Sequence, residues 1–270
     1  MSDLSVNTLF SVTGKVAIVT GGSRGIGRMI AEGYLANGAE RVYITARKPE
    51  QCEEAAAALS ALGECVPLPA DLADSADRKR FVEEIQRREP AIDILVNNAG
   101  VAWGQPFESF SEEGYDKTVD INQKAPFFLT RDLLPQLKAR ASSDDPSRVI
   151  NVGSIDGIWV PPQINYAYGP SKAAVHHLTR VLAVELGPHA ITVNAIAPGP
   201  FETKMMQFTI DHNREKLKAG SFMNRLGEPS DMAGVALYLA SRAASYVTGV
   251  VIPVDGGVTL RPGVDSLVPD

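Results

Sequence analysis

Short apolar runs rich in β-branched residues alternate with longer helical stretches along nearly the whole chain. The run Val16–Thr20 leads into a glycine-rich turn, and Ile26, Ile30 and Tyr34 then recur at the four-residue spacing of one helix face. Strands that are apolar throughout, each followed by a helix, indicate a parallel sheet that is covered on both sides. We therefore expect an α/β fold: a single Rossmann-like, doubly wound parallel sheet with helices on both faces.

The same rhythm predicts the other elements. Further strands are expected at Arg41–Thr45, Cys65–Ala70, Ile92–Val96, Val149–Gly153, Ile191–Ala197 and Val250–Val254, and helices at Glu50–Leu62, Ser75–Arg88, Gly114–Leu137, Ala167–Leu186 and Asp231–Ala240. Gly38 is expected to end the first helix, and Asp74 or Ser75 to cap the helix after the third strand.

We expect residues 1–270 to form one dinucleotide-binding and catalytic domain. Residues 198–229 are polar and are predicted to be irregular, which makes them a candidate lid over the substrate. Residues 260–270 are predicted to be a C-terminal tail.

Composition argues against several classes of function. The net charge is -6 and no block of Lys and Arg occurs, so no nucleic-acid partner is expected. The two cysteines are too few for a disulfide framework, and no apolar run approaches the ~20 residues of a membrane span. Residues 1–14 lack the pattern of a secretory signal. His176 and His177 are adjacent and have no evident third ligand. We therefore expect a cytoplasmic protein with no membrane partner and no metal site.

Gly21, Gly25 and Gly27 lie between the first strand and the first helix. Glycines there let the backbone turn close to a pyrophosphate, and the helix N-terminus offers free N–H groups to it. The spacing departs from the G-x-G-x-x-G pattern, so a tight turn without a ligand is the alternative. The position after the first strand favours a dinucleotide site.

The end of the second strand indicates which dinucleotide binds. NAD enzymes carry an acidic residue there, which binds the ribose 2′-hydroxyl. This chain has Arg47 and Lys48 instead, and together with Arg24 they could hold a 2′-phosphate. The alternative is that Arg47 and Lys48 are solvated loop charges. We expect the cofactor to be NADP(H).

Tyr168 and Lys172 are four residues apart, which places them on one face of a helix. An ammonium beside a phenol favours the phenolate and would lower the phenol pKa from its reference value of ~10. Such a phenol can exchange a proton with a carbonyl or alcohol oxygen. Pro170 fits only in the first turn, so the helix should begin near Tyr168. The pair alone is also compatible with a surface position.

Ser154 and Asn122 extend this group. Ser154 follows a predicted strand at its carboxyl end, where ligands bind in such sheets, and its hydroxyl could bind a substrate carbonyl or simply cap a turn. Asn122 is mildly unfavourable inside a helix, which indicates a role such as holding a water, although a solvent-facing position is the alternative. Together the four residues predict the interconversion of a ketone and a secondary alcohol.

The chain resembles the short-chain dehydrogenase/reductases over essentially its whole globular length. The matching residues are Thr20–Gly27, Asp71-Leu72, Asn97-Asn98-Ala99-Gly100, Asn122, Ser154, Tyr168-x-x-x-Lys172, Pro198-Gly199 and Thr203. Within this family the chain is similar to the 3-oxoacyl-(acyl carrier protein) reductases, particularly those of the branch linked to rhamnolipid precursor synthesis.

The resemblance implies a role for each matching residue. Tyr168 would be the general acid/base, Lys172 would lower its pKa and bind the nicotinamide ribose, Ser154 would orient the carbonyl, and Asn122 would hold a water. Gly21, Ser23, Arg24, Ile26 and Gly27 would line the cofactor, Asp71 and Leu72 would meet the adenine, Asn98 the adenosine side, and Pro198, Gly199, Phe201 and Thr203 the nicotinamide carboxamide. A homotetramer is implied, with a dimer as the smaller option, built partly through the helices near Gly114 and Tyr168.

The sequence is compatible with several classes of substrate. A 3-oxoacyl thioester is expected, and a carrier-protein partner would favour a basic entrance, for which the candidates are Lys124, Lys204, Arg214, Lys216 and Lys218. Asp156 and Trp159 depart from the pattern near the pocket. A gluconate-type sugar or polyol dehydrogenase and a steroid-type reductase are the alternatives among enzymes, and a non-catalytic dinucleotide sensor is the alternative outside them.

Overall fold

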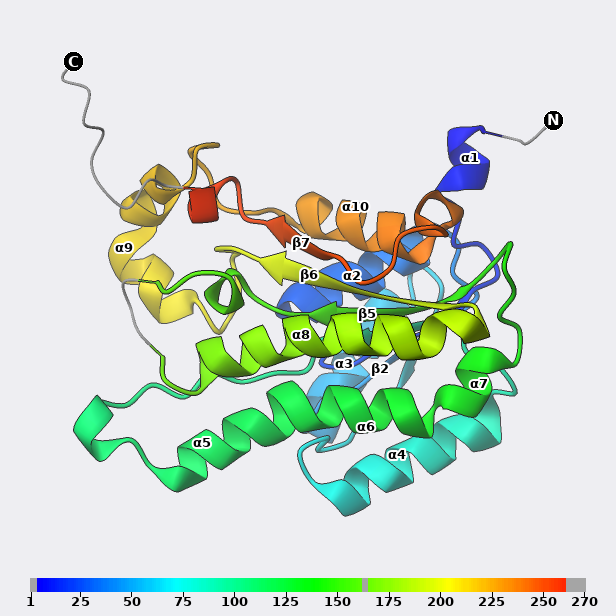
Figure 1. Cartoon of the computed structure of the whole chain (residues 1–270), viewed down its shortest axis with the longest axis horizontal. Coiled ribbons are helices and arrows are strands. Elements are labelled where there is room, and N and C mark those ends of the chain that lie inside the picture. The colour runs from blue at the N-terminus through cyan, green and yellow to red at the C-terminus, as the bar shows by residue number, and fades with distance from the viewer. Residues whose placement is uncertain (1–3, 162–164, 261–270) are drawn as a thin grey trace.

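A single seven-stranded sheet forms the centre of the computed structural model, which describes residues 4–161 and 165–260 (Figure 1). The strands are β1 (Val16–Val19), β2 (Arg41–Ile44), β3 (Glu64–Pro67), β4 (Ile94–Asn97), β5 (Ser147–Val152), β6 (Ile191–Pro198) and β7 (Val251–Val254). Their order is β3-β2-β1-β4-β5-β6-β7, and every neighbouring pair is parallel. The chain therefore winds outward in both directions from β1 and β4, which confirms the predicted fold.

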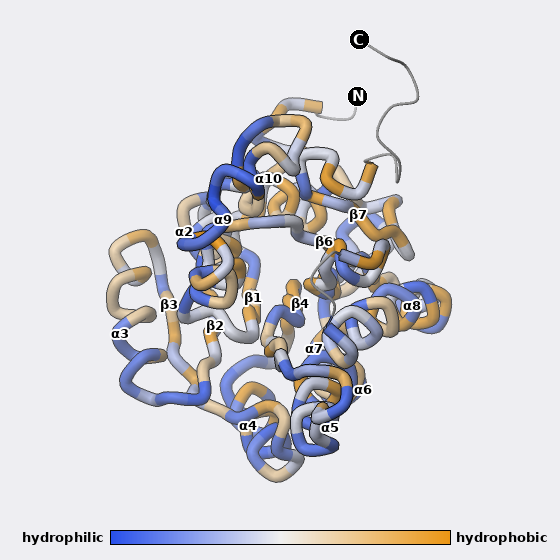
Figure 2. The backbone as a smooth tube through the Cα atoms, turned by 90° about the vertical axis from the view of Figure 1, so that its left-hand side faces the viewer, coloured by the Kyte–Doolittle hydropathy of each residue, from blue (hydrophilic) through white to orange (hydrophobic). Residues whose placement is uncertain are grey.

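Helices cover both faces of this sheet, as the end-on view in Figure 2 shows. They are α1 (Val6–Leu9), α2 (Gly25–Ala36), α3 (Pro49–Leu59), α4 (Ser75–Arg88), α5 (Glu112–Val119), α6 (Ala125–Asp132), α7 (Leu134–Lys138), α8 (Tyr168–Leu186), α9 (Gln207–Gly220) and α10 (Pro229–Ala240). One buried core joins the sheet to α2, α3 and α10, and the other joins it to α4, α6, α7 and α8. Because helices cover both faces, the strands are mainly apolar. None of the helices in the described ranges has the length and apolarity that crossing a membrane requires.

Local sequence chemistry determines several helix boundaries as predicted. Gly38 has a φ of +86° just after α2, a conformation that glycine adopts without strain. The Asp74 side chain accepts a hydrogen bond from the Asp77 N–H and caps α4. Pro170 lies in the first turn of α8, which begins at Tyr168.

The segment Gly114–Leu137 is helical as predicted, although it is not one regular α-helix. The segment contains α5, a π-helical stretch η2 (Asp120–Lys124), α6 and α7. Pro126 explains the interruption, because it has no N–H to donate to the Asn122 carbonyl four residues earlier.

The predicted irregular stretch 198–229 also needs correction, because α9 occupies its middle. Ile210 is the buried residue of this helix, so its sequence lacks the apolar face that would reveal it. Most of the predicted tail, residues 261–270, lies outside the described residues.

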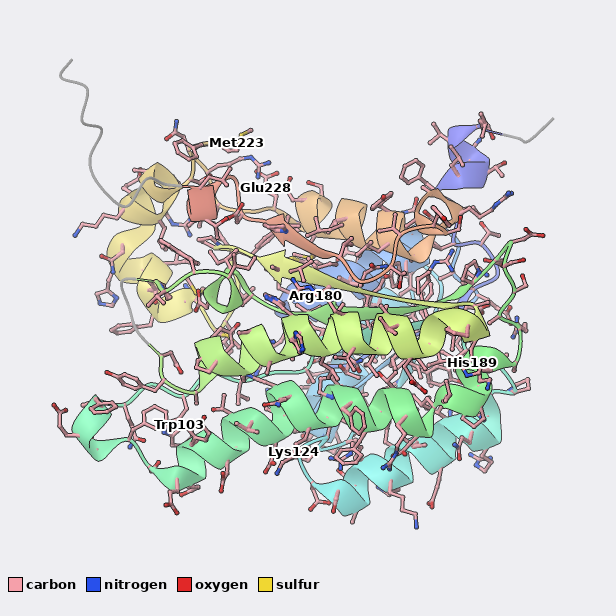
Figure 3. All side chains as sticks on the ribbon, viewed as in Figure 1. Trp103, Lys124, Arg180, His189, Met223 and Glu228 are labelled. Carbon is pink, nitrogen blue, oxygen red and sulfur yellow. The ribbon has the colours of Figure 1, made fainter. Side chains whose placement is uncertain are left out.

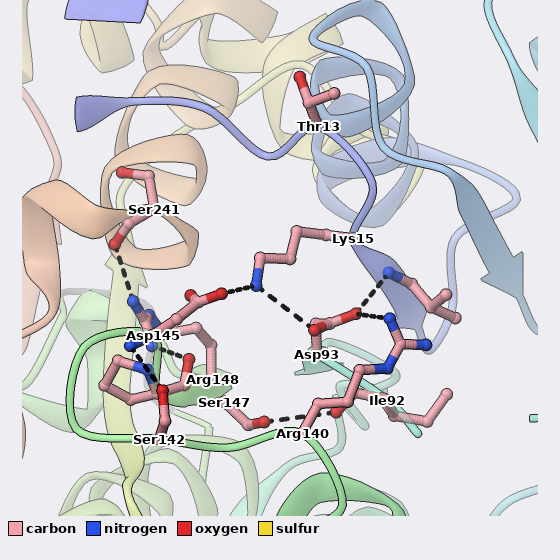
Figure 4. A network of polar contacts seen from close by, with 12 residues as sticks. Thr13, Lys15, Ile92, Asp93, Arg140, Ser142, Asp145, Ser147, Arg148 and Ser241 are labelled. Carbon is pink, nitrogen blue, oxygen red and sulfur yellow. Dashed lines mark hydrogen bonds and ion pairs between the residues drawn. The ribbon is translucent and has the colours of Figure 1, made fainter. Parts of the chain in front are cut away.

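Polar contacts link the amino ends of the strands (Figure 4). Asp93, just before β4, accepts hydrogen bonds from the Val16 N–H at 2.9 Å and from Lys15 at 3.4 Å. Lys15 also contacts Asp145 at 2.5 Å, and the buried Arg148 guanidinium donates to the Ser241 carbonyl at 3.0 Å. Hydrogen bonds and ion pairs between side chains therefore stabilise the amino edge of the sheet, whereas the predicted site residues lie at the carboxyl edge.

Candidate active site

The turn between β1 and α2 is shaped to approach an anion closely. Gly21 and Gly25 have φ values of +66° and +54°, and a Cβ on Gly27 would lie 2.5 Å from the Gly21 carbonyl oxygen. Side chains at these positions would strain or block the turn. The N-cap residue Arg24 makes no side-chain hydrogen bond to the helix, so the first N–H groups of α2 are available to a phosphate.

Asn98 and Thr203 hold or approach this turn from two other segments. The Asn98 Nδ2 donates to the Thr20 carbonyl at 2.7 Å and to the Gly21 carbonyl at 3.3 Å, so this amide braces the turn itself. Thr203, beyond β6, lies 3.3 Å from the point where a Cβ on Gly25 would stand. A dinucleotide that lies along the turn would therefore pass both segments.

The cationic residues expected to hold a 2′-phosphate are exposed and unpaired. Across residues 4–161 and 165–260, the side chains of Arg24, Arg47 and Lys48 make no hydrogen bond or ion pair. The Gly21 N–H donates to Thr45 Oγ1 at 3.3 Å, which ties the end of β2 to the phosphate turn. The three unpaired cations around this junction fit a phosphorylated ribose better than a hydroxyl.

Two residues that the resemblance assigns to the cofactor have their side chains in the core. Leu72 and Phe201 are each 2% exposed, and the Phe201 ring packs on Gly227. Only their backbones can meet a ligand. Ser23 and Ile26 are half-buried in the glycine turn.

The remaining residues assigned to the cofactor lie at or just after the carboxyl ends of strands. Asp71 Oδ1 accepts from the Ala73 N–H at 3.1 Å, which orders the turn after β3. Pro198 is the last residue of β6, and the Gly199 N–H donates to the Val254 carbonyl at 2.9 Å. Both segments thus reach the carboxyl edge of the sheet, where the glycine turn lies.

Ser154, Tyr168 and Lys172 come together at the same edge. Ser154 follows β5, and its hydroxyl accepts from the Asp156 N–H at 3.1 Å and lies close enough to the Tyr168 phenol to lower the pKa of that group. Lys172, one helical turn after Tyr168, is 4% exposed and donates to the Val152 carbonyl at 2.8 Å. Its ammonium lies 5.6 Å from the centre of the phenol ring.

The charge states of this group differ from the prediction that Lys172 lowers the phenol pKa. Burial raises the pKa of Tyr168 to about 12, against the opposing effect of the Ser154 hydrogen bond. Burial also lowers the pKa of Lys172 to about 8. Desolvation is therefore the main influence on both groups, and Tyr168 is a neutral proton donor at neutral pH.

Asn122 is buried and acts as a brace. Its amide accepts from the Val101 N–H at 2.9 Å and donates to the Val101 carbonyl at 3.0 Å. It also donates to Ser171 Oγ at 3.0 Å, and that hydroxyl donates to the Tyr168 carbonyl at 2.7 Å. The solvent-facing alternative is therefore wrong, because this side chain ties the loop after β4 to the first turn of α8.

His176 is a part of the site that the sequence analysis missed. It was considered above only as a candidate metal ligand, but it is 4% exposed and packs beneath the Ser154 loop, where burial lowers its pKa to about 4. A Cβ on Gly153 would stand 2.0 Å from its Nε2, and one on Gly157 2.9 Å from its Cε1. The two glycines that flank this loop were the signal that a bulky group lies below.

Comparison with known sequences gives a consistent result. Residues 21–259 match the profile of the family described as enoyl-(acyl carrier protein) reductase. The rhamnolipids biosynthesis 3-oxoacyl-[acyl-carrier-protein] reductase of Pseudomonas aeruginosa is 47% identical over 254 residues, which cover 93% of this chain and 98% of that protein. Dehydrogenase/reductase SDR family member 4 of Homo sapiens is 37% identical over 254 residues, which cover 92% and 88%.

Solved structures agree with the sequence relatives. A Pseudomonas aeruginosa RhlG/NADP active-site complex superposes with a TM-score of 0.89 at 46% identity and covers 93% of this chain and 98% of that one. A gluconate 5-dehydrogenase from Burkholderia cenocepacia in complex with NADP and tartrate gives a TM-score of 0.87 at 28% identity, with coverage of 96% and 100%.

Proposed function

Because this chain belongs to the short-chain dehydrogenase/reductase family, we propose that it reduces the ketone of a 3-oxoacyl thioester at the Ser154, Tyr168 and Lys172 cluster. The enzyme is an NADP(H)-dependent oxidoreductase that interconverts ketones and secondary alcohols. The observation that carries the assignment of residues is the meeting of a strand-end hydroxyl, a neutral phenol and a buried amine beside the glycine turn.

Each residue of the cluster has a distinct task in this proposal. The bound cofactor supplies hydride to the carbonyl carbon. The Ser154 hydroxyl orients the carbonyl oxygen, and the Tyr168 phenol donates a proton to that oxygen as negative charge develops. Lys172 stabilises the resulting phenolate and binds the nicotinamide ribose. The Asn122 carbonyl, which has no α-helical donor because residue 126 is proline, is proposed to hold the water that returns the proton.

The cofactor contacts follow the same edge of the sheet. We assign the pyrophosphate to the turn and the 2′-phosphate to the three unpaired cations. The proposed contacts are Gly21, Ser23, Arg24, Ile26, Gly27, Arg47, Lys48, Asp71, Asn98, Pro198, Gly199 and Thr203, with the backbones of Leu72 and Phe201.

Exposed apolar side chains favour an acyl substrate over a sugar. Val160, on the loop that begins at Ser154, is 77% exposed, and Phe208, in the first turn of α9, is 74% exposed. Ile158 and Met205 on the same two segments are also exposed. An acyl chain would bury this apolar surface, whereas a polyol would leave it exposed to water.

A basic entrance for an acyl carrier protein receives limited support. Arg214 pairs with Glu202 at 2.5 Å, and Lys218 pairs with Glu215 at 2.9 Å. Lys124 also pairs with an acidic neighbour, Asp120, and lies on the line of α5 and α6, away from α9 (Figure 3). Lys204 and Lys216 are exposed and make no ion pair within the described ranges, so we propose them as the carrier-protein contacts.

We also propose assembly into a homotetramer, or a dimer, in the cytoplasm. Val181 and Val184 are exposed on α8, and Phe127 is exposed on α6, so these neighbouring helices offer apolar area to a second copy. The cysteines Cys52 and Cys65 are buried free thiols, which suits a reducing compartment.

The test is consumption of NADPH, followed by its absorbance, with 3-oxoacyl thioesters, β-keto esters, polyol-derived ketones and cyclic ketones. Turnover should be fastest with the thioesters, and Tyr168→Phe should abolish it while leaving NADPH binding nearly intact. Faster turnover of sugar ketones would favour the gluconate-type activity. Binding of NADPH without turnover of any ketone would favour a sensor.

A further inference from the structure

Asp156 places one carboxylate beside the reacting groups, on a loop that is otherwise apolar toward its outer end. It lies in the 3-10 turn η3 (Ile155–Gly157), directly after Ser154. The loop then continues outward through the exposed Ile158 and Val160. A substrate that reaches the Ser154 hydroxyl along this loop must pass the acid.

The turn holds Asp156 in place from two sides. Its N–H donates to Ser154 Oγ at 3.1 Å, and a Cβ on Gly169 would lie 3.1 Å from its carbonyl oxygen, which packs against the first turn of α8. Gly157, the next residue, packs on the backbone of α8 at Lys172 and Ala173 and on the buried ring of His176. The backbone of Asp156 is therefore fixed beside Ser154 and the first turn of α8.

The Asp156 carboxylate has no partner of its own. Within residues 4–161 and 165–260 it accepts no hydrogen bond and forms no ion pair, although the residue is half-buried. Its charge is felt at the phenol, because it helps to raise the pKa of Tyr168. A half-buried acid without a partner is costly, and a ligand that supplies a donor relieves that cost.

We propose that Asp156 selects the substrate, by accepting a hydrogen bond from a hydroxyl or amide N–H near the reacting ketone and by excluding ketones that carry an anionic group there. The inference rests on the proposed reductase function. A 3-oxoacyl thioester carries no charge at that position and is accepted. A free 3-oxo acid would place its carboxylate near the acid and would be rejected.

Two pairs of ketones of matched size test this selection. 4-Hydroxy-2-butanone is compared with 2-pentanone, and methyl acetoacetate with acetoacetate, using kcat/KM with saturating NADPH. The variants are Asp156→Asn, which removes the charge, and Asp156→Ala, which removes the acceptor. Asp144→Asn, in the exposed loop before the amino end of β5, is the matched control.

The wild type and the control should prefer the hydroxyketone over 2-pentanone by about tenfold, the effect of one hydrogen bond to a charged group. Asp156→Ala should bring this ratio close to one, and Asp156→Asn should improve acetoacetate relative to its methyl ester by about tenfold. Unchanged ratios in both variants, with normal turnover of methyl acetoacetate, would overturn the role of Asp156 alone. No NADPH consumption by the wild type with any ketone would overturn the proposed function, and this inference with it.

Discussion

Replacing Lys172 by methionine is expected to stabilise the protein at neutral pH while it removes the activity. The Lys172 side chain is almost completely buried, and burial lowers its pKa from the ordinary 10.5 to about 8. Methionine has a similar length and no charge, so it fills the same space without the cost of burying an ammonium.

The size of the effect follows from the pKa and from one hydrogen bond. Each pKa unit corresponds to about 1.4 kcal/mol, so keeping Lys172 protonated costs the folded state about 3 kcal/mol at pH 7. The variant gains this amount but leaves the Val152 carbonyl without its donor, at a loss of about 1 kcal/mol. The net gain of about 2 kcal/mol corresponds to roughly 4 to 8 °C in Tm for a chain of this size.

The gain should depend on pH in a defined direction. Because the folded pKa lies below the unfolded one, the unfolded chain binds the extra proton between pH 8 and 10.5. The free energy of unfolding of the wild type therefore rises with pH across this window relative to that of the variant. Below pH 8 the difference between the two proteins has its full size. Urea unfolding at pH 7 and pH 9.5 measures the size of this difference and its change with pH. Lys138→Met, on the exposed face of α7, is the control, and its free energy of unfolding should lie within about 0.5 kcal/mol of the wild-type value. A Lys172→Met protein that is less stable than wild type at pH 7, or a gap that does not narrow at pH 9.5, would refute the reasoning.

Three further substitutions test the cofactor site and the packing of two glycines. Arg47→Asp should raise the KM for NADPH by at least about tenfold, from the loss of a charge-assisted hydrogen bond, and change that for NADH far less; equal changes would remove Arg47 from the 2′-phosphate site. Gly153→Ala should lower the free energy of unfolding by about 1–3 kcal/mol, because its Cβ meets the His176 ring at 2.0 Å. Gly234→Ala, in α10 with open space around it, should raise it by about 0.5–1 kcal/mol. Thermal melts in which both glycine variants shift in the same direction would contradict this account of packing.

The parts of the fold that the sequence predicts well are those determined locally. Alternation of apolar strands and amphipathic helices led to the parallel sheet, and Gly38, Asp74 and Pro170 marked helix boundaries because each acts within one turn of itself. Ser154 and Tyr168 were brought together by a general property of parallel sheets, whose carboxyl ends share one edge.

The parts that the sequence did not predict depend on distant neighbours. The burial of His176 requires Gly153 and Gly157 on another segment, and no pattern around the histidine itself reveals them. The burial of the Phe201 ring likewise depends on Gly227, because only a residue without a side chain leaves room for the ring there. The raised pKa of Tyr168 reflects desolvation, which is a property of the assembled site.

The proximity of Thr203 to the turn at Gly25 joins two segments that are far apart in the chain and are made at different times. During synthesis the glycine turn emerges first, but Thr203 reaches it only after β6 has entered the sheet. The dinucleotide therefore recognises the finished fold and not a partly made one. At a hundred times its Kd, such a ligand adds about 2.7 kcal/mol to the folded state. A cell rich in NADP(H) would thus keep more of this chain folded and out of reach of proteases, which couples the abundance of the enzyme to the supply of its own reductant.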